Sequence, residues 1–492
     1  MPHNYGRPGK EGVADMATQG SKIAKALAFV KKSGARDVNL KFVDLVGRWH
    51  QVMIPVTNFT AEIFRRGVSF DGSSVPGYTG LESGDLGLIP DPTTCFVEEV
   101  AGPRSVSLIC YVVEADSKRP FNRDPRLVAA KAERFLVASG IADEACFMPE
   151  LEFNLFDEVK LVGLPAATGY TIKSLEAGME PECSGKIYPW ISGKGYHAVP
   201  PLDRCSSLRS AMVDEIQRAG IDVKYSHHES GSAGQCEIEV RSATLLAAAD
   251  HIVTAKYLIK NVAMRHGIVA TFIPKPLFGQ PGNGMHFHQN LAKQGRNIFF
   301  KKGGYGNLSK EALYYIGGLL KHGRALLGLT CPSTNSYKRL VPGYEAPVCF
   351  TYAIANRSAA VRIPKGSAVE QDARVEFRPS DASSNPYLAT AAMLMAGLDG
   401  IRNKIDPEKA GFGPFDQDAF KVTDLKAKGI MAVPFDLHEA LEALRSDHEF
   451  LLEGGVFTED LIRTWIDLKY NLEIYPVSLH PHPYEIELYL DC

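Results

Sequence analysis

FMPELEFNLFD, residues 147–157, is the stretch from which the fold of this chain can be predicted. Apolar and polar side chains alternate along it, with Phe147, Leu151, Phe153 and Leu155 set against Met148, Glu150, Glu152 and Asn154. This period of two is typical of a half-buried β-strand, on which residues two apart lie about 6.6 Å from each other. Glu150 and Glu152 therefore share a face and repel each other. A divalent metal would relieve that repulsion, but an acidic face exposed to solvent is equally compatible with this strand alone.

Three later stretches repeat the pattern of one apolar and one charged face. They are SHHESGSAGQCEIEVRS (226–242), GNGMHFHQNL (282–291) and DARVEFRPS (372–380). Their polar faces carry Gln235, Glu237, Glu239 and Arg241, then His286, His288 and Asn290, then Arg374, Glu376 and Arg378. Glu229 precedes the first of these strands across a Gly/Ser-rich bend that can fold it back beside Glu237. Curled together, the four strands would line one polar cavity.

The chemistry of this cavity follows from its donor set. Five glutamates with one histidine suit Mg²⁺ or Mn²⁺, which prefer oxygen ligands and tolerate an imidazole, whereas zinc favours more nitrogen or sulfur. The six ligands, enough for two metal ions, would be Glu150, Glu152, Glu229, Glu237, Glu376 and one histidine. The two histidines, 286 and 288, could also form an ordinary polar face, and their spacing does not decide between these alternatives.

A segment rich in arginine supplies positive charge. Residues 333–364 read STNSYKRLVPGYEAPVCFTYAIANRSAAVRIP and hold Arg339, Arg357 and Arg362 beside proline-punctuated loops. Arginine suits bidentate contacts with carboxylates and phosphates. Divalent metals together with several arginines fit phosphoryl transfer, where catalysis consists mainly of positioning and charge neutralisation. A surface network of ion pairs is the alternative for any single arginine.

Composition narrows the class of protein. The 492 residues are 45% hydrophobic, and 54 Lys and Arg oppose 57 Asp and Glu for a net charge of -3, so nothing points to nucleic acid or an anionic membrane surface. The nine cysteines include no Cys-x-x-Cys pair, which favours a reducing compartment over a disulfide framework. No signal peptide or apolar span is recognisable. A cytoplasmic location is expected.

The order of patterns along the chain predicts an α+β protein of two domains after a loose N-terminal arm, residues 1–20. A helix over 21–33, a hairpin around Gly47 and the loop FDGSSVPGYTG (70–80) belong to a small domain, 21–121. Asp124 is then placed as an N-cap with Pro125 at the first helical position, which opens a large domain, 122–492. No glycine-rich phosphate-binding motif is present in the sequence, so a nucleotide must be held another way.

From about Lys25 to the C-terminus, the order and spacing of the motifs resemble those of a known family, type I glutamine synthetase. The motifs are DGSS, PELEFNLFD, HHE with AGQCEIEVR, TFIPKPLFG with GMHFH, NSYKRLVPGYEAP, NRSAAVRIP, VEFRPSD with NPYLA, GGVFTEDLI and HPHPYEIELY. The resemblance implies ligation of glutamate to ammonium, driven by ATP through a γ-glutamyl phosphate. It also implies a small β-grasp-like N-terminal domain and a large catalytic domain, with a curved antiparallel half-barrel sheet flanked by helices.

Carried over position by position, the resemblance assigns roles. Glu152, Glu229 and Glu237 resemble ligands of the metal near ammonium, and Glu150, His286 and Glu376 resemble those of the metal bridging the ATP phosphates. Asp71 would take a proton from ammonium, and Glu345 would close over the intermediate. Arg339 would hold the glutamate α-carboxylate, and Arg357 and Arg378 the transferred phosphoryl group. The remaining carried-over contacts are Ser74, Tyr196 and Gly282 for the substrates and His288, Arg362 and Arg374 for the nucleotide.

The resemblance further implies a homo-oligomer, a dodecamer of two hexameric rings with each active site between neighbouring subunits. On that pattern Asp71 and Ser74 serve the adjacent subunit's site, and the C-terminal HPHPYEIELYLDC reaches into the opposite ring.

Three positions depart from the family. Pro281 stands where an asparagine is usual near the glutamate amino group, so this contact must rest more on the Gly282 backbone. Lys224 replaces a usual glutamate and Tyr78 a usual tryptophan near the nucleotide. A γ-glutamyl ligase of the same fold acting on a polyamine or another amine is therefore the alternative enzyme. DGSS, Glu345 and Tyr196 favour ammonium. A catalytically inactive relative is disfavoured because all six implied metal ligands are present.

The loop around Phe415 bears on regulation. The tyrosine that is adenylylated in the regulated bacterial subgroup aligns near Phe415, which has no hydroxyl group to accept AMP. No Tyr, Ser or Thr lies between Lys404 and Lys421 to replace it. Incubation with ATP and an adenylyltransferase of that subgroup should leave the intact mass unchanged, and Phe415→Tyr would restore at most the acceptor. An AMP adduct on this loop in the wild-type protein would refute the alignment.

Overall fold

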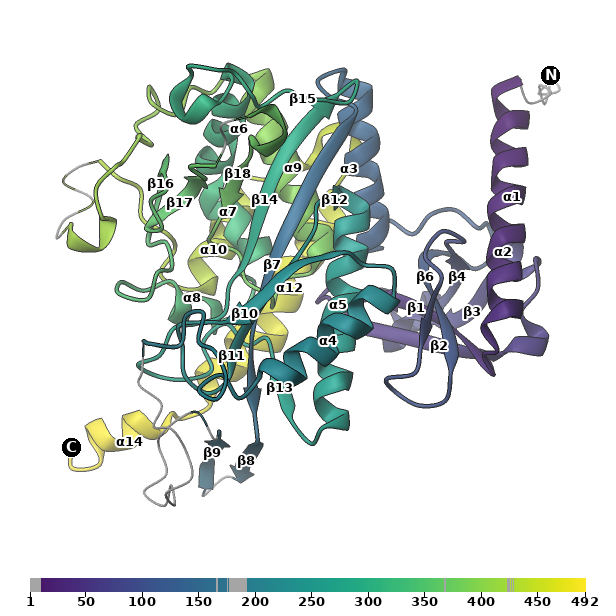
Figure 1. The fold of residues 1–492 in the computed structure, drawn as a ribbon, viewed down its shortest axis with the longest axis horizontal. Coiled ribbons are helices and arrows are strands. Elements are labelled where there is room, and N and C mark those ends of the chain that lie inside the picture. The colour runs from purple at the N-terminus through teal and green to yellow at the C-terminus, as the bar shows by residue number, and fades with distance from the viewer. Residues whose placement is uncertain are drawn as a thin grey trace. The chain divides into compact units, whose positions relative to one another are not determined.

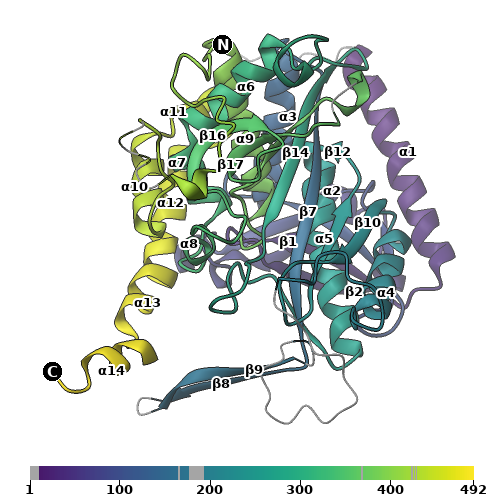
Figure 2. The same ribbon diagram turned by 60° about the vertical axis from the view of Figure 1, so that its left-hand side comes forward.

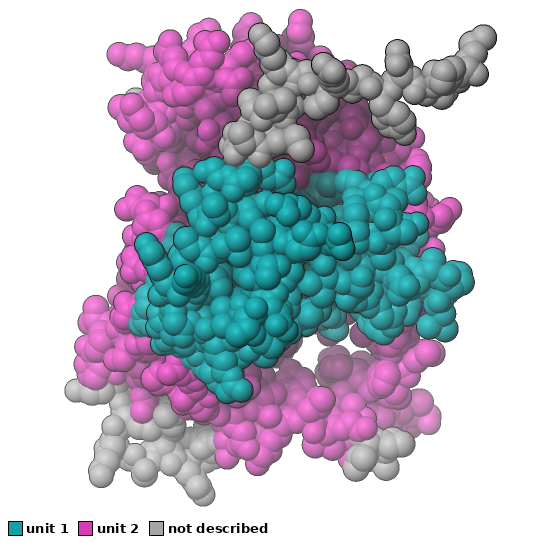
Figure 3. All heavy atoms as spheres, turned by 90° about the vertical axis from the view of Figure 1, so that its right-hand side faces the viewer, with its two compact units in different colours: residues 1–44, 48–127, 218–220 teal, residues 45–47, 128–217, 221–492 magenta. Residues whose placement is uncertain are grey.

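The structure is a computed structural model. It describes residues 10–164, 167–174, 176, 193–366, 369–422, 425, 427 and 429–492. By its internal contacts the chain divides into two compact units, coloured teal and magenta in Figure 3. Unit 1 comprises residues 1–44, 48–127 and 218–220, and unit 2 comprises 45–47, 128–217 and 221–492. The division falls after Leu127, close to the position near Asn122 where the sequence pattern places it.

Unit 1 is built on a six-stranded sheet in the order β2-β1-β6-β4-β3, with β5 paired to β6. Its elements are α1 (Lys10–Ser33), β1 (Asp37–Val43), β2 (Trp49–Pro55), α2 (Ile63–Arg66), β3 (Val68–Asp71), β4 (Asp85–Pro90), β5 (Phe96–Glu98) and β6 (Ser105–Glu114). The predicted hairpin is β1–β2, which pairs antiparallel, whereas β1 and β6 run parallel. This parallel pair inside a mixed sheet agrees with the β-grasp-like expectation.

Helix α1 begins earlier than the sequence pattern predicts. It covers Lys10–Ser33, so residues 10–20 are helical rather than a loose arm. Ala14, Met16 and Ala17 are good helix formers, and helix propagation costs little once the following amphipathic turns have formed. The sequence predicts a start at Ser21 because the apolar spacing begins there. Such spacing indicates only the part of a helix that packs against a core. Residues 1–9 lie outside the described residues.

Unit 2 contains a ten-stranded sheet in the order β10-β11-β7-β14-β18-β17-β16, with β12 and β13 on β7 and β15 on β14. Figure 1 shows β7 and β14 as two long adjacent strands at its centre. The strands are β7 (Glu144–Phe156), β10 (Val223–His228), β11 (Gln235–Val240), β12 (Ala243–Thr244), β13 (Val269–Thr271), β14 (Met285–Lys293), β15 (Arg296–Asn297), β16 (Cys349–Ile354), β17 (Ala359–Ile363) and β18 (Val375–Phe377).

One pair in this sheet departs from the expected antiparallel arrangement. Strands β16 and β17 run parallel, because residues 355–358 lead the chain back before β17 begins. Ala355 has a positive φ of 58° in this connection, a backbone conformation that turns the chain sharply. The sheet is therefore antiparallel only from β10 to β17.

The helices of unit 2 pack on the sheet and on one another. They are α3 (Pro125–Ser139), α4 (Ser206–Arg218), α5 (Leu245–Arg265), α6 (Lys310–Lys321), α7 (Gly323–Thr330), α8 (Ser336–Arg339), α9 (Pro386–Arg402), α10 (Leu437–Ser446), α11 (Glu449–Leu452) and α12 (Glu459–Lys469). Figure 2 shows α6, α7, α9 and α10 gathered on one side of β14. Every residue of α9 from 386 to 400 is buried, so this helix forms the centre of the core. The Asn385 side chain caps it by accepting a hydrogen bond from Tyr387 N at 3.1 Å.

Two parts of unit 2 extend away from the helices and the large sheet. The hairpin β8 (Glu158–Leu164) with β9 (Ala167–Lys173) forms a separate two-stranded sheet, and the C-terminal helices α13 (Tyr475–Leu479) and α14 (Pro483–Tyr489) project in another direction in Figure 2. Both carry exposed apolar side chains, among them Leu161, Tyr170, Leu479 and Ile486. Among the described helices, none combines the length and the apolar character needed to cross a bilayer.

A buried ion network joins the helices far from the sheet's polar face. His322, with 4% of its side chain exposed, lies between Asp399 at 2.8 Å and Asp447 at 2.9 Å and stacks on Phe450. Burial alone lowers the pKa of His322, but the two carboxylates outweigh it and raise the pKa above its ordinary value. The network therefore stabilises the fold most when the histidine is protonated.

Asp399→Asn should lower the free energy of unfolding by about 2 kcal/mol at pH 6, because it removes a charged hydrogen-bond partner. A group whose pKa is raised in the folded state contributes stability below its unfolded pKa and loses it as pH rises through the folded value. The loss of unfolding free energy caused by Asp399→Asn, measured by chemical denaturation, should therefore become smaller between pH 6 and pH 9. A penalty that grows with pH would contradict this charge assignment.

Candidate active site

Strand register brings the predicted ligands onto one face of the large sheet. Across β7 and β11, Glu152 is paired with Glu237 and Glu150 with Glu239. Across β7 and β14, Glu150 is opposite His286. Their neighbours in sequence, such as Leu151 and Ile238, are 0% exposed on the other face. The alternation predicted from sequence is confirmed, and the carboxylates of separate strands become neighbours.

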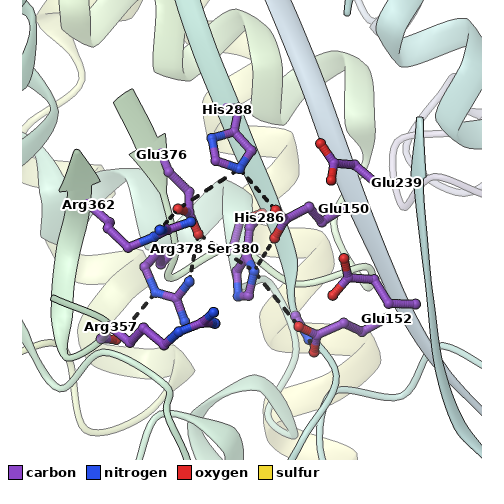
Figure 4. Close-up of polar contacts among 12 residues, drawn as sticks. Glu150, Glu152, Glu239, His286, His288, Arg357, Arg362, Glu376, Arg378 and Ser380 are labelled. Carbon is purple, nitrogen blue, oxygen red and sulfur yellow. Dashed lines mark hydrogen bonds and ion pairs between the residues drawn. The ribbon is translucent and has the colours of Figure 1, made fainter. Parts of the chain in front are cut away.

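The same face continues across β18 and β17. His288 is opposite Glu376, and Glu376 is opposite Arg362. Figure 4 shows these side chains converging with Glu150 and His286 on a common centre. The ligand atoms of Glu150, His286 and Glu376 lie within 4.8 Å of one another. Three of the six predicted ligands thus already form a cluster of the size a single cation requires.

This half of the site carries its own positive charge. Glu150 contacts His286 Nδ1 and His288 Nε2, each at 2.9 Å. Burial alone raises the pKa of Glu150, but the two histidines outweigh it and hold the pKa well below its usual value. Glu376 contacts Arg378 at 2.6 Å and Arg362, and despite complete burial its pKa falls to about 2, chiefly through Arg378 and His288.

The other half has the opposite electrostatic character. Glu152, Glu229 and Glu237 lie close together, and no lysine or arginine of the described residues is within ion-pair distance of them. Burial and then the charges of Glu150, Glu152 and Glu229 raise the pKa of Glu237 well above its ordinary value. Burial and then Glu152 raise the pKa of Glu229 to about 7. Such repelling carboxylates fit a divalent cation, which would replace the protons.

His227 completes this half. Its ring lies 3.5 Å from Glu237 and 3.7 Å from Glu229, and their ligand atoms form a second group within 4.8 Å. Burial lowers the pKa of His227, so the imidazole does not compensate the carboxylates. The sequence showed this histidine in the HHE motif without assigning it a role.

Most of these groups line a cavity of about 310 Å³ within unit 2, although Glu376 and His288 are not among its lining residues. Of the predicted residues, the following contribute to its wall: Glu150, Glu152, Tyr196, Glu229, Glu237, Gly282, His286, Arg339, Glu345, Arg357, Arg362 and Arg378. Pro281, where the chain departs from its family, also lines it. In Figure 4, Glu150 and Glu152 lie on one side of the site and Arg357, Arg362 and Arg378 on the other, which suits a ligand that carries both charges together with phosphates.

Arg339 is held rigidly at the cavity wall. Its guanidinium donates to Pro379 O at 2.7 Å and to Arg378 O at 3.2 Å, and only 3% of the residue is exposed. Gly282 makes this placement possible, because a Cβ there would lie 2.9 Å from Arg339 Cγ and 2.3 Å from Pro274 O. Any larger residue at this position would displace the arginine.

Glu345 lies on a strained, exposed loop. Its φ is 59°, a left-handed conformation that is costly for a glutamate, and 66% of its side chain is exposed. Its carboxylate lies 3.9 Å from Arg357, while its carbonyl accepts from Arg378 Nη2 at 3.1 Å. The loop is thus tied by its backbone to the site, while its side chain can move.

Some predicted residues do not line this cavity. Arg374 Nε donates to His288 Nδ1 at 3.3 Å, so this pair lies behind Glu150 rather than on the wall. Asp71 and Ser74 belong to unit 1, where the hydroxyls of Ser73 and Ser74 donate to Asp71 at 2.6 Å and lower its pKa. Tyr78, another position of departure, is 1% exposed in the core of unit 1, with its hydroxyl on Val43 O.

Glu239 was missed as a member of the site. It is 0% exposed, it lies opposite Glu150, and Lys224 contacts one of its oxygens at 2.7 Å. The alternation of strand β11 already placed Glu239 on the polar face. Its partner Lys224 could not be inferred from sequence, because β10 and β11 meet with an irregularity between Val223 and Tyr225.

Comparison with known proteins gives a consistent result. A family model described as the catalytic domain of glutamine synthetase matches residues 122–489, and one described as its beta-Grasp domain matches residues 34–115. A glutamine synthetase of Frankia alni is 44% identical over 476 residues, covering 96% of this chain and 99% of that protein. One of Mycolicibacterium smegmatis is 44% identical, covering 94% of this chain and 97% of its own length.

Solved structures agree. A cryo-EM structure of Plasmodium falciparum glutamine synthetase superposes with a TM-score of 0.85 at 27% identity, covering 95% of this chain and 98% of that one. A structure titled apo GmaS without ligand superposes with a TM-score of 0.76 at 26% identity, covering 95% and 99%. The expected fold, a β-grasp N-terminal domain and a catalytic domain with a curled sheet and helices, is confirmed.

Glu237→Gln should separate repulsion from metal binding. The change replaces a carboxylate whose ionisation is costly beside Glu152 and Glu229 with a neutral amide, so the metal-free protein should keep or gain thermal stability. The stabilisation by Mn²⁺, about 2.7 kcal/mol at a hundred times its Kd, should fall because a ligand is lost. Differential scanning fluorimetry with and without Mn²⁺ measures both effects, with Glu370→Gln, at a surface pair with Arg296, as the control. A lower Tm of the metal-free variant would contradict the repulsion.

Proposed function

The chain belongs to the glutamine synthetase family and joins glutamate and ammonia to form glutamine, and we propose that the cavity of unit 2 is where it does so. Family membership implies the use of ATP and a divalent metal. The observation that carries the proposal is the division of one cavity into an anionic wall and an arginine wall. The first suits metal and ammonium, and the second suits glutamate and phosphate.

The metal is proposed to be Mg²⁺ or Mn²⁺, with two ions in each site. Glu152, Glu229 and Glu237 would hold one ion, and Glu150, His286 and Glu376 the other. Carboxylate oxygens with a single imidazole support this choice over zinc. When bound, the ions neutralise phosphate charge so that a carboxylate can approach the γ-phosphoryl group of ATP.

The arginines would position the reactants. Arg339, fixed by backbone carbonyls, would bind the α-carboxylate of glutamate, with Gly282 and Tyr196 beside it. Arg357 and Arg378 would stabilise the transferred phosphoryl group, giving a γ-glutamyl phosphate and ADP. His288, Arg362 and Arg374 would contact the nucleotide. Holding both reactants on a rigid sheet reduces the entropic cost of their meeting.

Two carboxylates would complete the reaction. Asp71, hydrogen-bonded by neighbouring serines, would take a proton from ammonium, with Ser74 at its side. Ammonia can then attack the acyl carbon of the γ-glutamyl phosphate, and the C–O bond to phosphate breaks to release inorganic phosphate and glutamine. Glu345, on its strained loop, would cover the intermediate and keep water away, since water would otherwise hydrolyse it.

A γ-glutamyl ligase that uses a larger amine is the second candidate. The structure titled GmaS shares this fold, but curated relatives at 42–44% identity are named glutamine synthetases. Glu345 and Tyr196, the residues that favour the small ammonium ion by the family resemblance, both line the cavity.

An amine-dependent assay of ADP release tests this function. The purified protein with glutamate, ATP and Mg²⁺ should release ADP with ammonium, and far less with putrescine or methylamine. Glu376→Ala should lower kcat by more than tenfold because a metal ligand is lost. This corresponds to an increase of more than about 1.4 kcal/mol in the activation free energy. Preference for putrescine would favour the alternative ligase, and a Glu376→Ala variant retaining over a tenth of kcat would contradict the ligand assignment.

The oligomer is proposed to be a dodecamer of two hexameric rings, with Asp71 and Ser74 serving the site of an adjacent subunit. The exposed apolar residues of α13 and α14 support this assembly, because isolated chains rarely leave such a segment uncovered.

Mixing two inactive variants tests the shared site. Asp71→Ala and Arg339→Ala subunits, unfolded and reassembled together, should regain about a quarter of wild-type activity if pairing is random, because some sites then combine both intact parts. Separately reassembled parents are the control. A mixture as inactive as both parents, despite co-assembly shown by native mass spectrometry, would mean that each site is built from one chain.

A further inference from the structure

We infer that Glu176 is a positioning residue that holds the metal ligand Glu229 and the Tyr196 loop in register through His228. Glu176 lies outside the motifs that identify the family, in the segment that follows the hairpin β8–β9. The inference rests on the proposed metal site, and it concerns residues that do not themselves reach the cavity.

Glu176 and His228 form a fully buried pair. Glu176 is 3% exposed and His228 is 0% exposed, and Glu176 Oε2 lies 3.0 Å from His228 Nε2. His228 Nδ1 lies 2.6 Å from the carbonyl oxygen of Glu229. A carbonyl oxygen only accepts, so Nδ1 donates to it. The ring is therefore held at both nitrogens, with the peptide of Glu229 at one end and the Glu176 carboxylate at the other.

The ring's position matters because of where β10 ends. His228 is the last residue of β10 and is paired with Cys236, which precedes Glu237 on β11. Glu229 N donates to Gln235 O at 2.8 Å, which closes the bend between the two strands. Rotation of the His228 ring would move the Glu229 peptide, and with it the carboxylate that must point into the cavity. Groups that orient a metal ligand in this way commonly tune metal affinity.

The second oxygen of Glu176 holds a different segment. Oε1 accepts from Arg204 N at 2.9 Å and from the Cys205 thiol at 3.6 Å. The same segment returns to β10 at its other end, where His197 N donates to His228 O at 3.0 Å. Tyr196, beside His197, lines the cavity and stacks edge-on against His227 at 5.4 Å. One carboxylate thus joins the metal-ligand bend to the loop that borders the amine site.

A separate metal site outside the cavity is the obvious alternative, since ligand atoms of Glu176, Asp203 and His228 lie within 4.8 Å of one another. The hydrogen bonds argue against it. Asp203 accepts from Arg209 at 2.7 and 3.4 Å and from Cys205 N at 3.0 Å. The buried guanidinium of Arg209 already supplies the positive charge that a metal would bring. The cluster is therefore a support for the site.

The test compares Glu176→Gln with the matched control Asp399→Asn, which alters a buried carboxylate–histidine pair remote from the cavity, and with Glu176→Asp as a milder change. Binding of Mn²⁺ to the substrate-free protein is followed by electron paramagnetic resonance. We expect Glu176→Gln to weaken one of two Mn²⁺ sites about 10- to 100-fold and to leave the other unchanged. The KM for ammonium should rise more than that for ATP. Glu176→Asp should weaken the same Mn²⁺ site less, and Asp399→Asn should leave both sites unchanged.

A double variant tests the route through His228. If Glu176 acts through this ring, Glu176→Gln combined with His228→Asn should weaken Mn²⁺ no more than the stronger single change, because effects within one chain of contacts are not additive. The inference would be overturned if Glu176→Gln bound Mn²⁺ with unaltered affinity. If Glu176→Gln failed to fold, unaltered Mn²⁺ affinity in Glu176→Asp would overturn it in the same way. Failure of the wild-type protein to bind Mn²⁺ at all would instead refute the proposed metal function.

Discussion

The site depends on the electrostatic cost of holding several carboxylates on one face of a sheet. Strand pairing places Glu150 opposite Glu239 and Glu152 opposite Glu237, where like charges repel. On the Glu150 side, histidines and arginines compensate the charge. On the Glu237 side there is no such compensation from lysine or arginine among the described residues, and the raised pKa values of Glu229 and Glu237 report the resulting strain. A protein keeps such a cluster buried when a cation completes it.

The packing beneath the sheet makes this arrangement sustainable. Phe153 and Phe377 are 0% exposed on the face opposite the carboxylates, and helix α9 is buried along its length. Close-packed cores transmit strain rather than absorb it, so the strands cannot part to relieve the repulsion. The rigid acidic wall contrasts with the loop of Glu345, whose positive φ and exposed side chain leave it able to move. Such a division suits a reaction in which reactants are fixed first and water is excluded afterwards.

Support for the acidic wall reaches beyond the cavity. The ring of His228 connects the Glu229 bend to Glu176, and Glu176 in turn holds the backbone at Arg204. The orientation of a metal ligand depends on the groups that hydrogen-bond to it or to its backbone. Lys224 has a comparable part for Glu239, since its ammonium is the positive charge in contact with that buried carboxylate. These contacts explain how substitutions outside the cavity could change the site without altering any residue that touches substrate.

The strands, their polar faces and the donor set can be predicted from the amino-acid sequence alone, because alternation with a period of two is a local property of the backbone. Glu150, Glu152, His286 and Glu376 could be placed on one face of their strands without any structure. The choice of neighbouring strands and their register emerge only in the folded chain, since pairing joins residues far apart in the sequence. The charge balance of the two halves, the anchoring of Arg339 and the Glu176–His228 pair all follow from that pairing, and no periodicity in the sequence indicates them.

The early start of α1 and the parallel pair β16–β17 escaped prediction for a related reason. Helix extension depends on propagation rather than on an apolar stripe, and strand direction depends on the path of the connecting residues.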